Sequence, residues 1–136
     1  MNYFLAKTEP STYSIGHLEA DRKTIWDGVT NAQAVRAIGS MKAGDKVFLY
    51  HSGGESAVVG LARVATAGHS DPKNPKSAVA EFEFLTKLNA PVTLAEIKQS
   101  HLFDDWALVR QSRLSTMQAP ESFVIWMRKR FPAAKI

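Results

Sequence analysis

Lys7, Thr8 and Glu9 stand side by side and carry three groups that acid–base and nucleophilic catalysis use. An ammonium group can activate a hydroxyl, and a carboxylate can transfer protons. The run before them, YFLAK at 3–7, is typical of a strand, in which side chains alternate between the two faces. Lys7 and Glu9 therefore share one face and Thr8 takes the other. Two interpretations stay open, a catalytic set and a solvated strand end.

Tyr50, His51 and Ser52 form a second polar group at the end of an apolar run. By the same alternation, Tyr50 and Ser52 share a face that His51 does not. This pattern argues against a serine–histidine dyad. It allows Tyr50 and Ser52 to border one pocket.

Trp26 precedes Asp27 and Gly28, a pair typical of a turn. An indole held at a bend could offer a flat face to a ligand ring, or it could be a partly buried core aromatic beside a turn. Arg110 and Arg113 lie in the segment RQSRLS. Their guanidinium groups could hold a phosphate or a base edge, or they could be solvated surface groups.

Several classes of site are excluded by composition and spacing. The chain has no cysteine, and its four histidines show no metal-ligand spacing. It has no glycine-rich phosphate loop, so we expect neither a metal nor a cofactor. A net charge of +4 favours polyanions weakly. With no leader pattern and no apolar run of about 20 residues, we expect a cytoplasmic protein without membrane contact.

The elements that would position these residues can be read from local patterns. Strands are expected at 3–7, 46–52, 57–66, 79–86 and 106–110, the second and third forming an antiparallel hairpin. Helices are expected after Ser14 and Asn31 as N-caps, after a capping box of Thr93 and Glu96, and from Pro120. The segment GHSDPKNPK is expected to be a loop. The pattern predicts one α+β domain over 1–136, a small curved mixed sheet or barrel flanked by short helices.

Four motifs, KTEP, WDGVTNAQA, YHS and SRLS, occur in an order and at separations that resemble the EVE domain family. The resemblance runs from Tyr3 to about Met127. Families of this kind are PUA-like barrels, similar to the YTH domains that hold a methylated adenine between aromatic side chains. The resemblance implies a nonenzymatic module that recognises a modified base in DNA or RNA. The alternative is a small amidohydrolase-like enzyme in which Lys7, Thr8 and Glu9 act on a modified nucleoside or amide.

The resemblance also implies a set of ligand-binding residues. They are Trp26, Asn31, Lys7, Glu9, Tyr50, His51, Ser52, Arg113, Leu114 and Ser115. The chain departs from the family pattern WxGVRNYQARN at Thr30, Ala32 and Val35, and Ser77 replaces a frequent tryptophan. These replacements remove two cations and two aromatics, which implies a less anionic or differently shaped ligand.

Overall fold

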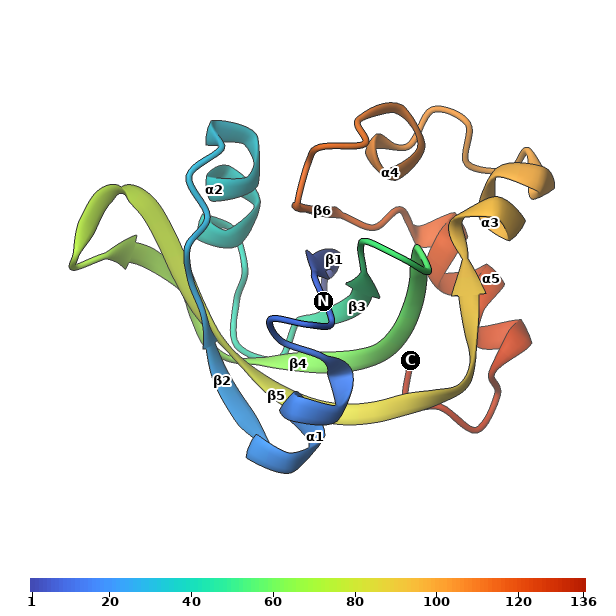
Figure 1. Cartoon of the computed structure of the whole chain (residues 1–136), viewed down its shortest axis with the longest axis horizontal. Helices are drawn as coiled ribbons and strands as arrows, with labels where there is room; N and C mark the ends of the chain where they lie inside the picture. The colour runs from blue at the N-terminus through green and yellow to red at the C-terminus, as the bar shows by residue number, and fades with distance from the viewer.

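A six-stranded curved sheet forms the centre of the protein, whose computed structural model describes all 136 residues (Figure 1). The strands follow the order β2-β5-β4-β3-β1-β6. Only β1 and β3 pair in parallel. The strands are β1 (Tyr3–Thr8), β2 (Lys23–Trp26), β3 (Lys46–His51), β4 (Ala57–Asp71), β5 (Asn74–Thr93) and β6 (Thr116–Gln118). The α+β architecture is confirmed, but the sheet is not a closed barrel, because β2 and β6 end it without pairing to each other.

Five short helices flank this sheet, and no helix is long and apolar enough to cross a membrane. They are α1 (Ile15–Asp21), α2 (Ala32–Gly39), α3 (Leu94–Ser100), α4 (Ala107–Arg110) and α5 (Glu121–Arg130). The predicted N-caps are confirmed, since the side chains of Ser14, Asn31 and Thr93 each accept a backbone N–H at the start of a helix. The capping box predicted at α3 forms only by its Thr93 half, because the Glu96 side chain pairs with Arg130 instead of accepting from the Thr93 amide.

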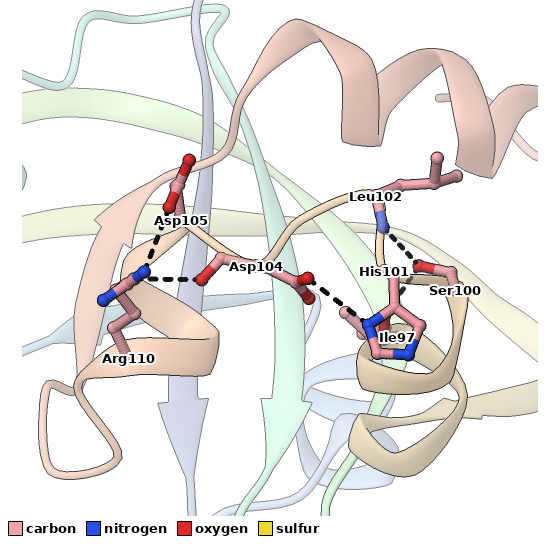
Figure 2. Close-up of polar contacts among 7 residues, drawn as sticks. All are labelled: Ile97, Ser100, His101, Leu102, Asp104, Asp105 and Arg110. Carbon is pink, nitrogen blue, oxygen red and sulfur yellow. Dashed lines mark hydrogen bonds and ion pairs between the residues drawn. The ribbon is translucent and has the colours of Figure 1, made fainter.

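Residues 106–110 were predicted as a strand. Instead, Trp106 is the N-cap of the single helical turn α4, which residues 107–110 form. The amides of Val109 and Arg110 donate to the Trp106 carbonyl at 2.9 and 3.1 Å. Figure 2 shows why the turn is held: the Arg110 guanidinium donates to the Asp104 carbonyl and to the Asp105 carboxylate at 3.0 and 3.1 Å. The Arg110 side chain therefore stabilises this turn through its bonds to residues 104 and 105. Medium-range contacts decide the conformation here, and the alternating pattern was misleading.

The hairpin of β4 and β5 is longer than the sequence predicted. The segment expected as a loop belongs largely to the two strands, with a turn only at Pro72 and Lys73. Repeated register shifts between β4 and β5 let this long ribbon bend around the core. Strands β2 and β6 were not predicted at all.

Helix α2 is fixed on β4 by a close backbone approach. A Cβ added to Gly68 would lie 1.7 Å from the carbonyl oxygen of Ile38, so only glycine fits there. The Gly68 amide also donates to the Met41 carbonyl at 3.0 Å. Ala34 and Ile38 complete the attachment by burying the apolar face of α2. The sheet thus sets the position of a helix whose N-terminus borders the pocket described next.

Candidate nucleic-acid interface

A pocket of about 540 Å³ opens between the ends of β1 and β2, and we name it the β1–β2 pocket. One wall consists of Lys7 and Thr8 with the segment that follows them, including Thr12 and Tyr13. The opposite wall consists of residues 24–31, and Ser115 contributes from the segment before β6. The volume is within the range of about 300–1,000 Å³ typical of small-ligand sites.

Trp26 is the last residue of β2 and belongs to both the core and the pocket. Its side chain is stacked on Phe82, with ring centroids 5.1 Å apart, and meets Tyr13 edge to face at 6.3 Å. Only 8% of the residue is exposed. Its Nε1–H donates to no protein atom, and no buried side-chain nitrogen or oxygen lacks a partner, so this N–H reaches the surface. Trp26 is therefore a core aromatic and also a residue of the pocket lining, which the sequence analysis gave as two separate interpretations.

Lys7 supplies the positive charge of the pocket. Its Nζ lies 5.5 Å from the centroid of the Tyr50 ring and donates to the Ser112 carbonyl at 3.1 Å. Burial lowers the pKa of Lys7, because the ammonium form loses hydration. No carboxylate pairs with it in the structure. An ammonium group with spare N–H donors and incomplete hydration is well suited to an acceptor on a ligand.

The loop from Asp27 to Asn31 is held from both ends. Gly28 has a positive φ of 76°, which glycine adopts without strain. The buried Ser77 hydroxyl donates to the Val29 carbonyl at 2.5 Å. The Asn31 side-chain oxygen accepts from the amides of residues 33 and 34, which leaves its NH₂ group without a partner in the protein. The buried serine at position 77 thus anchors this loop.

Two histidines fix the entry to α1, which follows the other wall of the pocket. The Ser14 amide donates to His17 Nδ1 at 2.9 Å, and the Ile15 amide donates to His51 Nε2 at 3.1 Å. Burial lowers the pKa of His51, with smaller opposing effects from the charges of Glu55 and Lys87. A neutral imidazole is also what an accepting ring nitrogen requires.

Tyr13 and Thr12 were missed by the sequence analysis although both line the pocket. The Thr8 hydroxyl donates to the Tyr13 carbonyl at 2.9 Å and so holds this segment against β1. The pKa of Tyr13 is raised, chiefly by burial. The sequence signal that could have found Tyr13 is its position just before the Ser14 N-cap, which places it on the connection between β1 and α1.

Four of the ten predicted ligand-binding residues line the β1–β2 pocket: Lys7, Trp26, Asn31 and Ser115. The other six lie outside its lining. The Glu9 side chain is exposed, Tyr50 is buried beneath Lys7, His51 caps α1, the Ser52 amide donates to the Thr8 carbonyl, Leu114 is in the core and Arg113 is exposed.

Lys7 and Thr8 of the proposed catalytic set both line the pocket, but the set is not joined by hydrogen bonds. The Lys7 ammonium donates to Ser112 and the Thr8 hydroxyl donates to Tyr13, so neither contacts the other. The Glu9 side chain makes no hydrogen bond or ion pair, and its backbone carbonyl accepts from the amides of Thr12 and Tyr13. The arrangement offers hydrogen-bond donors beside aromatic rings, which suits binding of a flat polar ligand.

Comparison with known proteins identifies the family. A model of the EVE domain matches residues 2–129, so the chain belongs to the EVE domain family. Thymocyte nuclear protein 1 of Rattus norvegicus is 31% identical over 128 aligned positions, which cover 74% of this chain and 57% of that protein. The chain thus spans a little over half the length of this curated relative.

Solved structures share the fold over almost the whole chain. The crystal structure of a protein from Agrobacterium tumefaciens has a TM-score of 0.90 and 28% identity, covering 100% of this chain and 97% of that one. The human THYN1 protein, solved in complex with DNA containing 5-methylcytosine, has a TM-score of 0.83 and 25% identity, covering 95% and 98%. Both confirm the open curved sheet with short flanking helices.

Proposed function

We propose that this chain binds DNA or RNA carrying a modified base, and that the β1–β2 pocket takes the base without catalysing a reaction on it. The single observation that carries the proposal is a pocket that offers two kinds of donor: the Trp26 N–H, which has no partner in the protein, and the N–H groups of Lys7 beyond the one that donates to Ser112. The complex of the human relative with 5-methylcytosine DNA supports the same class of ligand.

The chemistry of the pocket fits a base that has left its stack. Aromatic surface supplies stacking or edge contact, which contributes about 1–3 kcal/mol per base. The donors of Lys7, Trp26 and Asn31 suit acceptors such as N3 and O2 on the Watson–Crick edge of a cytosine. Extruding a base also requires a protein surface that replaces the lost contacts, and an open pocket beside exposed cations supplies one.

The test compares paired oligonucleotides that differ at one base. We would measure the affinity of the wild-type protein for 12-nucleotide DNA strands with one central 5-methylcytosine or cytosine, and for a panel with other modified bases in DNA and RNA. We expect one modified base to bind more tightly than its plain counterpart. Free modified nucleoside should compete, because the pocket recognises the base itself.

Variants connect base binding to the pocket. Lys7→Met keeps the aliphatic stem over Tyr50 and removes the charge, so the affinity for the modified strand and for the free modified nucleoside should fall by about tenfold, the loss expected for one hydrogen bond to a charged group. The matched control is Lys98→Met on α3, where the side chain is exposed and far from the pocket lining. An unchanged affinity of Lys7→Met for the modified strand and nucleoside would contradict the proposal, as would equal affinity of the wild type for every modified and plain pair.

A further inference from the structure

A second hollow, of about 370 Å³, lies beside the β1–β2 pocket, and we name it the α2–β6 groove. Its lining is Gln33, Arg36, Ala37 and Ser40 from α2, and Ala107, Thr116, Met117 and Gln118 from the facing segments. In Figure 1, α2 stands next to the segment that joins α4 to β6. The side chains of Ala37 and Ala107 are short, so they leave space between these two walls.

The linings of the groove and the pocket adjoin along two segments of the chain, although no residue lines both. The N-cap of α2, Asn31, lines the pocket, and the helix that it starts lines the groove. On the other side, Ser115 lines the pocket and the next residue, Thr116, lines the groove. A nucleic-acid strand with one base in the pocket would therefore place its next nucleotide at the groove.

The arginines that have no partner within the protein lie near the groove and the pocket, which suits binding of a polyanion. Five of the seven arginines have a partner within the protein: Arg22 with Phe84, Arg63 with Glu83, Arg110 with Asp105, Arg128 with Tyr3, and Arg130 with Glu96. The side chains of Arg36 and Arg113 make no hydrogen bond, ion pair or aromatic contact. Arg36 lines the groove, and Arg113 follows Ser112, whose carbonyl accepts from Lys7. No carboxylate lines the groove.

We propose that the α2–β6 groove binds the nucleotide next to the base in the β1–β2 pocket, with Arg36 on its phosphate. The inference rests on the proposed function and narrows it to a strand of at least two nucleotides, single or locally opened. The amide groups of Gln33 and Gln118 in the lining would serve the sugar and the base edge. Met117 adds an apolar contact to the same lining, so the groove offers a nucleotide more than a cation for its phosphate.

The experiment separates strand binding from base binding. We would compare Arg36→Met with the charge-matched control Lys98→Met, using the 12-nucleotide strands and free 5-methyldeoxycytidine. One phosphate contact contributes about 0.7 to the slope of log affinity against log salt for a single strand, or about fivefold in affinity between 1 M and 0.1 M salt. Arg36→Met should lose about fivefold for modified and plain strands alike, with nucleoside affinity unchanged. Lys98→Met should change neither.

Each outcome has one meaning. If Arg36→Met equals Lys98→Met while the wild type still prefers the modified strand, the groove proposal is wrong and the proposed function stands. If Arg36→Met weakens both strands but the wild type has no preference, the groove stands as a nucleic-acid site and the base pocket is wrong. Absence of strand binding by the wild type overturns both. Because Arg36 lies in the last turn of α2, unchanged thermal unfolding of the variant confirms that the helix is intact.

Discussion

Replacing Trp26 with alanine should lower the free energy of unfolding by about 4 kcal/mol. The indole is 8% exposed, is stacked on Phe82 and contacts Tyr13 by its edge. Buried aromatic side chains remove about 150–250 Å² from water, which at about 25 cal/mol per Å² gives about 4–6 kcal/mol. Measured truncations of buried Phe and Trp fall at about 3–5 kcal/mol. Such a loss is a large fraction of the stability of an ordinary domain.

Urea unfolding at pH 7.5, followed by far-ultraviolet circular dichroism, measures this difference. Trp26→Phe keeps a ring against Phe82 and should lose much less. Ile125→Ala is the control, because Ile125 is 43% exposed and should change stability by no more than about 0.5 kcal/mol. A loss below about 1 kcal/mol in Trp26→Ala, with an unchanged m value, would refute the packing argument and make Trp26 a free platform at the surface.

Two further changes probe the walls of the pocket. Gly68→Ala should lower stability by about 1–3 kcal/mol, because the new methyl group must displace α2 from its contact at the Ile38 carbonyl; an unchanged melting temperature would show that α2 moves freely. The lowered pKa of His51 means that the unfolded chain binds the proton first, so stability should be fully present above about pH 6.5 and fall as the pH drops toward the folded-state pKa. His51→Gln keeps an acceptor for the Ile15 amide and should show a weaker loss between pH 7.5 and 5.5; identical pH profiles would exclude His51 as the titrating group.

Local signals were enough to predict most of the elements. Ser14 and Asn31 marked their helices correctly because an N-cap is defined by hydrogen bonds within one turn. Strand β2 was not visible, since its pairing partner in β5 lies far along the chain and its own exposure is irregular. The same reason explains β6. Residues 106–110 form a helical turn because the Arg110 side chain donates to Asp104 and Asp105, and the alternating pattern that predicted a strand does not reveal these contacts.

The candidate site was harder to predict than the fold. Lys7 and Trp26 were found because unusual residue types mark them in the sequence. The family resemblance implied that Tyr50 and His51 bind the ligand, yet the Tyr50 ring lies against the Lys7 ammonium and His51 accepts from the Ile15 amide at the start of α1. Tyr13 had no motif, and only the fold brings it opposite Trp26. Spacing along a strand gives the face of a side chain, but it does not show which neighbour covers that face.

The unpaired ends of the sheet have a kinetic consequence for ligand exchange. Strands β2 and β6 flank the hollow region, and no ladder of backbone hydrogen bonds joins them. Helix α2 packs close to β6 at this seam, so widening the seam would separate α2 from β6 and would leave every strand pair intact. A bound strand of nucleic acid would contact both sides of this seam and hold them together. Its residence time would then be set by how often the seam opens, and its binding would slow hydrogen exchange in both edge strands at once.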